Sequence, residues 1–288
     1  MRRYGHCGGM ESYVWELTHA LADLDLKVEV ICEQVFGSPS PNITIHTVAV
    51  RKSSTRWRSM LNFRATIDDL ITKQYAGRKI IIHSHERTLN HQVTTFHGPP
   101  INVRTEWWRF SQLSPRIKAW QNMEKDEITG PQVTFVLPVS NIIKEQLFSL
   151  HPDVRHKNVV VAYPGVNQGP HQKNALKKNK QTRNQFVFIG SEWKRKGLKL
   201  AIQLVEYYDA HFNHCTMEVF GPEASDLPRY IRQHPNLVLK GWSKNIAWSK
   251  YDALIHPATS EPFGMVVAEA RSRGVPVLTT NLVGSTEL

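Results

Sequence analysis

The strongest constraint on the fold is a regular alternation of short β-branched runs with amphipathic stretches along most of the chain. This alternation is typical of β/α units around a mainly parallel sheet. The runs form two series, which predict strands at 27–33, 79–84, 92–96, 133–139 and 158–163, and then at 186–190, 216–220, 237–240, 252–256 and 275–279. Apolar residues three or four positions apart predict helices at 10–22, 63–74, 140–149, 197–210 and 264–273.

The segment between the two series, residues 167–185, has almost no apolar residue, and it carries five Lys or Arg and no acidic residue. We expect a basic linker or exposed loop here, between an N-terminal domain at 1–166 and a C-terminal domain at 186–288. A length of 288 residues agrees with two compact α/β domains of about 150 residues each.

Composition narrows the class of protein. No apolar run reaches the roughly 18 to 20 residues of a membrane-spanning helix, and the start of the chain lacks the apolar stretch of a signal peptide. Cys7, Cys32 and Cys215 follow no disulfide or metal spacing, so we expect free thiols in a reducing compartment and a cytoplasmic protein.

The net charge predicts an anionic partner. The chain has 36 Lys and Arg against 25 Asp and Glu. Nucleic acid is one candidate, but the chain shows no recognition-helix, RNA-stacking or zinc-finger pattern, and its cations are spread over both predicted domains. We therefore expect no nucleic acid partner.

Gly8 and Gly9 lie at the start of the first predicted helix. Backbone amides and the positive end of the helix dipole suit an approaching phosphate or sugar there, and glycine allows a close approach. The alternative is an ordinary glycine turn. Only seven residues precede Gly8, so the first strand of the domain looks clipped. The sole Asp-X-Asp, at 23–25, follows this helix, and we interpret it as a solvated turn rather than a metal site.

A second motif lies at 186–197, FVFIGSEWKRKG. A strand with the continuous apolar composition of a buried strand ends at Gly190. Arg195 and Lys196 come directly before a predicted helix. Two cations at the carboxyl edge of a parallel sheet suit a diphosphate, because Arg can bind two oxygens at once and Lys adds a point charge. The alternative is a charged surface loop.

The third motif, at 252–276, carries two glutamates, Glu261 and Glu269, with seven residues between them. Carboxylates accept paired hydrogen bonds from vicinal diols, so one glutamate suits a sugar and the other a ribose. Either glutamate by itself is typical of a solvated surface. Three backbone amides at the start of the following helix can meet sugar hydroxyls or phosphate; they belong to Phe263, Gly264 and Met265.

Eight segments together resemble one family, the retaining GT-B glycosyltransferases of family 4, and within it the lipopolysaccharide core glucosyltransferases. The segments are GGMES at 8–12, TTFHG at 94–98, PVSNIIKEQL at 138–147, VAYPGVN at 161–167, IGSEWKRKG at 189–197, VFG at 219–221, HPATSEPFGMVVAEA at 256–270 and GVPVLTT at 274–280. They occur in the family's order across nearly the whole chain.

The resemblance implies an α/β, GT-B fold, with two Rossmann-like domains that face each other across a donor and acceptor cleft. It implies that the second domain holds most of the nucleotide. Relatives continue past the last residue of this chain through a helical segment that packs back on the first domain. We therefore expect a chain that is truncated at both ends.

The resemblance also assigns roles to the motif residues. Arg195 and Lys196 would neutralise the diphosphate, Glu269 would bind the ribose, and Glu261 with the amides at 263–265 would bind the transferred sugar. Gly8, Gly9 and Gly190 would line the donor site. His97 would lie near the anomeric carbon of the sugar; the alternative for His97 is a strand-end histidine that hydrogen-bonds to the backbone.

The implied activity is a metal-independent, retaining transfer of a hexose from a nucleotide diphosphate sugar, with a UDP-sugar favoured and no other cofactor. The acceptor would be a glycan or glycolipid in the biosynthesis of cell-surface polysaccharide or lipopolysaccharide. The leaving diphosphate would help to deprotonate the acceptor, so no dedicated protein base is expected. Two alternatives stay open: a nucleotide-sugar-binding protein without catalysis, and a GT-B nucleotide-sugar epimerase, which the Glu261 and Glu269 spacing disfavours.

Two basic stretches, at 51–64 and 102–120, mix cations with large apolar side chains such as Trp57, Trp107 and Trp108. Such composition suits an anionic membrane surface, where cations meet head groups and Trp lies at the boundary. The hypothesis is a peripheral attachment to the inner face of the cytoplasmic membrane, close to a lipid-linked acceptor. The alternative is a buried Trp cluster with solvated cations.

Overall fold

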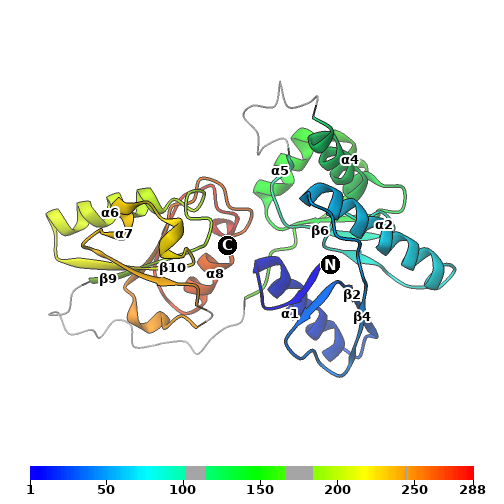
Figure 1. Ribbon diagram of the computed structural model, residues 1–288, viewed down its shortest axis with the longest axis horizontal. Coiled ribbons are helices and arrows are strands. Elements are labelled where there is room, and N and C mark those ends of the chain that lie inside the picture. Colours follow the sequence, from blue (N-terminus) through cyan, green and yellow to red (C-terminus); the bar gives the residue numbers. More distant parts are fainter. Residues whose placement is uncertain (102–113, 167–183, 244) are drawn as a thin grey trace. The chain divides into compact units, whose positions relative to one another are not determined.

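The computed structural model describes residues 1–101, 114–166, 184–243 and 245–288 (Figure 1). The chain divides into two compact units, Met1–Pro164 and Gly165–Leu288. None of the helices within the described ranges combines the length and the apolar character that crossing a bilayer requires.

The C-terminal unit contains a parallel sheet with the strand order β11-β10-β9-β12-β13. The strands are β9 (Asn184–Ile189), β10 (Cys215–Phe220), β11 (Leu237–Gly241), β12 (Ala253–His256) and β13 (Val277–Thr279). The chain moves outward in one direction from β9 and then returns to add β12 on the other side. The carboxyl ends of β9 and β12 therefore form the topological switch point, where open α/β sheets bind their ligands.

Helices cover both faces of this sheet. They are α6 (Leu198–His211), α7 (Arg229–Arg232) and α8 (Met265–Ser272). The neighbouring residues Val187 and Phe188 on β9 are both fully buried, and they belong to different apolar clusters, one with α8 and one with α6. Because successive strand side chains point to opposite faces, β9 is buried on both sides, as parallel sheets generally are.

A close backbone approach joins the loops that follow β9 and β12. Gly197, the residue before α6, has φ +81°, and a Cβ at this position would clash with the carbonyl oxygen of Pro257. The Thr259 amide also donates a hydrogen bond to the Arg195 carbonyl at 2.9 Å. These contacts fix the two loops of the switch point against each other.

The N-terminal unit has three sets of parallel strands, β1 with β3, β2 with β4, and β5-β6-β7-β8. They are β1 (Arg3–Gly5), β2 (Val28–Cys32), β3 (Gln34–Phe36), β4 (Ile43–Thr47), β5 (His83–Ser84), β6 (Val93–Phe96), β7 (Phe135–Pro138) and β8 (Asn158–Val159). The helices are α1 (Gly9–Asp23), α2 (Arg56–Gln74), α4 (Pro115–Thr129) and α5 (Asn141–Leu150).

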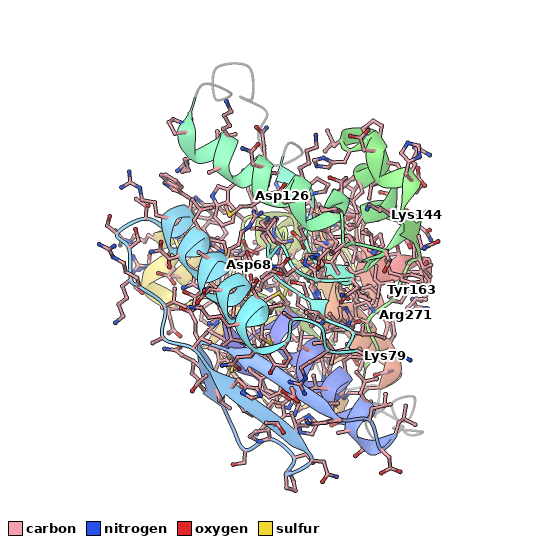
Figure 2. All side chains as sticks on the ribbon, turned by 90° about the vertical axis from the view of Figure 1, so that its right-hand side faces the viewer. Asp68, Lys79, Asp126, Lys144, Tyr163 and Arg271 are labelled. Carbon is pink, nitrogen blue, oxygen red and sulfur yellow. The ribbon has the colours of Figure 1, made fainter. Side chains whose placement is uncertain are left out.

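A partly buried ion pair joins α2 and α4. Arg64 on α2 is 8% exposed, and its Nη2 lies 2.6 Å from Oδ2 of Asp126 on α4. Its Nε lies 4.0 Å from Oδ2 of Asp68, one turn further along α2. Figure 2 shows Asp68 and Asp126 on the two neighbouring helices. Met123 of α4 packs in the apolar cluster formed by α2, so both polar and apolar contacts hold the pair.

The α/β fold class and the strands of the second series are confirmed, and several elements of the N-terminal unit were missed. The strand before Gly8 does exist, as Arg3–Gly5. The predicted strand at 79–84 is formed only at its end, and α2 begins seven residues before the predicted start. α4 was not predicted because its buried face includes Glu124 and Glu127, which break the apolar periodicity.

Replacing Gly197 with Ala should lower the free energy of unfolding, because the methyl group meets a backbone carbonyl that cannot rotate away. Gly274→Ala is the matched control, since Gly274 has φ +73° and nothing within 4 Å of an added Cβ. The control should lose about 1 kcal/mol through the left-handed backbone alone. Gly197→Ala should lose about 2 kcal/mol more in urea unfolding. Equal losses would contradict the close approach.

Candidate functional site

Two loops bring charged residues together at the switch point of the C-terminal unit. Arg195 and Lys196 lie between β9 and α6, and Glu261 lies between β12 and α8. Nη1 of Arg195 lies 3.0 Å from Oε2 of Glu261, and Nζ of Lys196 lies 3.5 Å from the same oxygen. The sequence motifs at 186–197 and 252–276 therefore meet in one site.

The Glu261 carboxylate is ionised over the whole ordinary pH range. Its side chain is 12% exposed, and burial by itself would raise its pKa. His256 and the positive charges of Lys196 and Arg195 outweigh burial and lower the pKa to about 2. Arg195 is further held by the Ser260 carbonyl and by Glu192, whose Oε2 lies 3.1 Å from Nε.

Glycine at 190 makes room for the Lys196 side chain. Gly190 has φ +155°, and a Cβ there would clash with Cδ of Lys196. The aliphatic part of Lys196 therefore crosses the backbone at the end of β9 on its way to Glu261. Within this structure Gly190 has a supporting role, since it lets Lys196 reach the switch point.

Glu269 lies on α8 and has a carboxylate that makes no hydrogen bond or ion pair among the described residues. Burial raises its pKa, while the charges of Arg273 and Lys196 act in the opposite direction. An unpaired, half-buried carboxylate beside a cation can accept the two hydroxyls of a diol.

The start of α8 is shaped by a glycine. Gly264 precedes the helix with φ +87°, and a Cβ there would press on Val283 and Glu261. The Phe263 carbonyl accepts a hydrogen bond from the Ser285 amide at 2.7 Å. Met265 is the first helical residue, so its amide has no acceptor within the helix and is available to a ligand.

His256 at the end of β12 also belongs to this cluster, and sequence reasoning gave it no role. It is fully buried, and burial lowers its pKa. Its Nε2 lies 3.8 Å from Oε2 of Glu261, an ion-pair distance rather than a hydrogen bond. The sequence signal for His256 was its position at the end of the strand predicted at 252–256, directly before Pro257.

In the N-terminal unit, His97 follows β6 and contacts other side chains. Its Nε2 lies 3.1 Å from Nδ1 of His85, and its ring centroid is 5.1 Å from that of Tyr13. Burial, followed by the charge of His83, lowers the pKa of His97 to about 3. The hydrogen bond recorded for His97 is to this side chain and not to the backbone. His83 and His85 were missed, although the pattern His-Ser-His at the end of a strand marked them.

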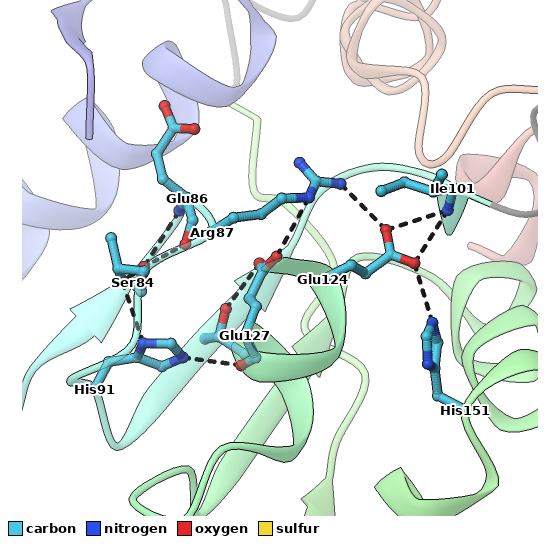
Figure 3. Close-up of polar contacts among 10 residues, drawn as sticks. Ser84, Glu86, Arg87, His91, Ile101, Glu124, Glu127 and His151 are labelled. Atoms are coloured by element: carbon cyan, nitrogen blue, oxygen red, sulfur yellow. Dashed lines mark hydrogen bonds and ion pairs between the residues drawn. The ribbon is translucent and has the colours of Figure 1, made fainter. Parts of the chain in front are cut away.

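The loop after His97 is held by a buried polar network (Figure 3). Glu124 on α4 is 1% exposed and accepts hydrogen bonds from the Ile101 amide at 3.1 Å and from Arg87 Nη2 at 3.2 Å. Its Oε1 lies 3.0 Å from Nε2 of His151. Burial raises the pKa of the neighbouring Glu127 to about 7. Glu124 of α4 thus holds the backbone at Ile101, four residues after His97.

The glycine loop before α1 presents a carboxylate as well as backbone amides. Gly8 precedes the helix in an extended conformation, and a Cβ there would clash with the Glu11 carboxylate. Glu11 is 7% exposed and forms an ion pair with Arg3. Residues 23–25 are exposed, and no group of three His, Cys, Asp or Glu among the described residues is arranged to hold a metal.

The basic stretch at 51–64 divides into two parts. Met60, Phe63 and Arg64 are buried within the N-terminal unit. Trp57 is half-buried, with the Arg58 guanidinium 4.9 Å from its ring centroid. The cations that face solvent are Arg51, Lys52, Arg56 and Arg58. Of the stretch at 102–120, residues 102–113 lie outside the described residues.

Comparison with known families identifies the chain. Residues 7–169 match Glycosyltransferase Family 4, and residues 171–288 match Glycosyl transferases group 1. The chain belongs to glycosyltransferase family 4. The family predicted from the sequence motifs is therefore confirmed.

Two curated relatives match part of this chain. An uncharacterised 41.2 kDa protein in the cps region of Klebsiella pneumoniae is 25% identical over 160 residues, which are 52% of this chain and 44% of that protein. Lipopolysaccharide glucosyltransferase WaaG of Escherichia coli K12 is 27% identical over 145 residues, 47% of this chain and 36% of WaaG. The matched region is thus less than half of either relative.

Solved structures show the fold. The crystal structure of WaaG, a glycosyltransferase involved in lipopolysaccharide biosynthesis, aligns with a TM-score of 0.81 over 100% of this chain and 81% of that one, at 18% identity. Sucrose-phosphate synthase from Thermosynechococcus elongatus aligns with a TM-score of 0.72 over 99% and 78% of the two chains, at 17% identity. The predicted GT-B fold is confirmed.

The lowered pKa of His97 gives a pH prediction for the N-terminal unit. His97 should stay neutral at about pH 5 in the folded chain, and in concentrated urea it should titrate near its ordinary pKa of about 6.5. The unfolded chain then binds a proton that the folded chain does not bind. The free energy of unfolding should therefore decrease as the pH falls below about 6.5. Nitrogen-edited NMR of the histidine rings measures the pKa of His97, and the variant His97→Gln assigns its signal. Protonation of folded His97 near pH 6.5 would contradict the burial of its ring.

Proposed function

We propose that this protein is a retaining glycosyltransferase that moves a hexose from a nucleotide diphosphate sugar, with UDP favoured as the nucleotide. The observation that carries the proposal is the pair of cations, Arg195 and Lys196, at the switch point of the C-terminal sheet and directly before α6. A diphosphate carries the opposite charge, and helix starts at the carboxyl edge of such sheets are its usual place.

The donor would be divided between neighbouring groups. Arg195 and Lys196 bind the diphosphate, and the unpaired carboxylate of Glu269 binds the ribose hydroxyls. Glu261 and the amides at the start of α8 bind hydroxyls of the transferred sugar. This division is supported by the chemistry of each group, since the cations match phosphate and the carboxylates match diols.

The proposed reaction is a front-face displacement. The bond between the anomeric carbon and the phosphate oxygen breaks, and a bond from the same carbon to the acceptor oxygen forms on the same face. The proton of the acceptor hydroxyl passes to the leaving diphosphate. Negative charge develops on phosphate oxygens, where preorganised Arg195 and Lys196 stabilise it, so the reaction needs no metal and no protein base.

The proposed acceptor is a glycan or a lipid-linked glycan of cell-surface polysaccharide or lipopolysaccharide. The support is the similarity to WaaG, described as a lipopolysaccharide glucosyltransferase, and to a protein of a cps region. We place His97 near the anomeric carbon, where its neutral ring can bind a sugar hydroxyl without competing for the acceptor proton.

Thermal-shift measurements with a panel of nucleotide sugars should identify the donor, because a ligand that binds only the folded state raises the unfolding temperature. Incubation with that donor and lipopolysaccharide core fragments then separates three activities. Free nucleoside diphosphate with a lengthened acceptor marks the transferase, and an isomerised sugar nucleotide marks an epimerase. Binding without either product marks a protein that binds the donor without catalysis.

Removing both cations should abolish transfer. The double variant Arg195→Ala and Lys196→Ala should lower kcat/KM for the donor by about 100-fold or more, because the leaving diphosphate loses its charge stabilisation. Arg229→Ala is the matched control, since Arg229 is exposed and hydrogen-bonds only to Gln233 among the described residues. Transfer at the wild-type rate in the double variant would remove the site assignment.

We further propose peripheral binding to anionic membranes through the exposed cations at the start of α2. Arg56→Glu with Arg58→Glu should reduce co-sedimentation with phosphatidylglycerol vesicles at low salt, since each exposed cation near such a surface contributes about 1 kcal/mol. Arg78→Glu with Lys79→Glu, just past the other end of α2, is the control. Wild-type protein that stays in the supernatant would disprove membrane binding.

A further inference from the structure

His256 is a buried side chain with an unexplained environment. It is 0% exposed, and neither Nδ1 nor Nε2 has a hydrogen-bond partner among the described residues. Leaving a buried polar nitrogen unpaired destabilises the folded state. Native proteins satisfy nearly all such groups, so a partner in another state of the site is the natural explanation.

The partner within reach is Glu261. Nε2 of His256 lies 3.8 Å from Oε2 of Glu261, so a movement of about 1 Å would bring the pair to hydrogen-bond distance. Arg195 and Lys196 hold the same oxygen, at 3.0 and 3.5 Å. Oε1 of Glu261 makes no hydrogen bond or ion pair among the described residues. The cations therefore determine where the carboxylate points before a ligand binds.

A bound diphosphate changes this balance. Its oxygens compete with Glu261 for Arg195 and Lys196, because charge-assisted hydrogen bonds to phosphate are strong. A buried carboxylate that loses its cations is strongly destabilised unless another donor replaces them. Apart from these two cations, His256 is the one described side chain with a nitrogen at ion-pair distance from Oε2, at 3.8 Å.

We propose that His256 is a positioning residue, which donates a hydrogen bond from Nε2 to Oε2 of Glu261 once a diphosphate has engaged Arg195 and Lys196. This contact orients Oε1 of Glu261 toward the hydroxyls of the transferred sugar. The inference rests on the proposed function, since it requires a nucleotide diphosphate sugar at this site.

The surroundings of His256 suit this role. Burial lowers the pKa of the ring, which favours its neutral form. A neutral ring carries its proton on one nitrogen, and that nitrogen can donate. The charged groups that act on the ring are Glu261, Lys196 and Arg195. The ring of Phe188 stacks against it from β9, with centroids 6.2 Å apart, and restricts its rotation.

The test compares UDP with UDP-glucose by isothermal titration in wild type, His256→Leu and His256→Gln. The ratio of the two Kd values measures what the sugar adds to binding. His256→Leu should reduce this ratio about tenfold and change the Kd of UDP less than about twofold, because one hydrogen bond to a charged group is lost. His256→Gln should restore part of the ratio, since its amide can donate.

Glu261→Gln provides a second measurement. It should bind UDP at least as tightly as wild type, because the competitor for Arg195 and Lys196 has lost its charge. His256→Leu added to Glu261→Ala, which removes the acceptor oxygen, should reduce the ratio no further than Glu261→Ala does, since the two residues act through one contact.

The outcomes separate this inference from the proposed function. A ratio that His256→Leu leaves unchanged, or a loss that affects UDP and UDP-glucose equally, overturns the positioning role. A further loss in the double variant also overturns it. A wild-type chain that binds neither nucleotide, or binds both equally, contradicts the assignment of the donor to this site, and this inference falls with it.

Discussion

The convergence of Arg195 and Lys196 on one oxygen of Glu261 joins the two loops that define the candidate site. The backbone makes this possible, because Gly197 lets the β9–α6 loop meet the carbonyl of Pro257. Glu261 offsets one of the two positive charges, and Glu192 forms a further ion pair with Arg195. A donor diphosphate would have to replace these carboxylates as the partner of the two cations. Binding would therefore exchange one set of ion pairs for another.

This arrangement explains which features the sequence predicted well. The second series of strands is buried on both faces, so short β-branched runs identified it with little ambiguity. The motif residues Arg195, Lys196 and Glu261 fall directly after strands, and parallel strands bring their carboxyl ends to one edge of the sheet. Their proximity therefore follows from the topology of a parallel sheet, whatever their side-chain conformations.

The N-terminal unit shows why other features could not be predicted. α4 buries Glu124 and Glu127, because Arg87 and His151 supply partners from distant parts of the chain. A prediction from the spacing of apolar residues assigns such glutamates to the surface. The contact of His97 with His85 likewise depends on the pairing of β5 with β6. The proposed role of His256 rests on ring nitrogens without a hydrogen-bond partner among the described residues, and no sequence pattern displays that.

A crystal structure of the chain with UDP-glucose would test directly whether Arg195 and Lys196 hold the donor. We expect the diphosphate within hydrogen-bond distance of Arg195 and Lys196, with Glu269 on the ribose and Glu261 on the glucose. A diphosphate bound elsewhere, with Arg195 and Lys196 still paired to Glu261, would contradict this expectation.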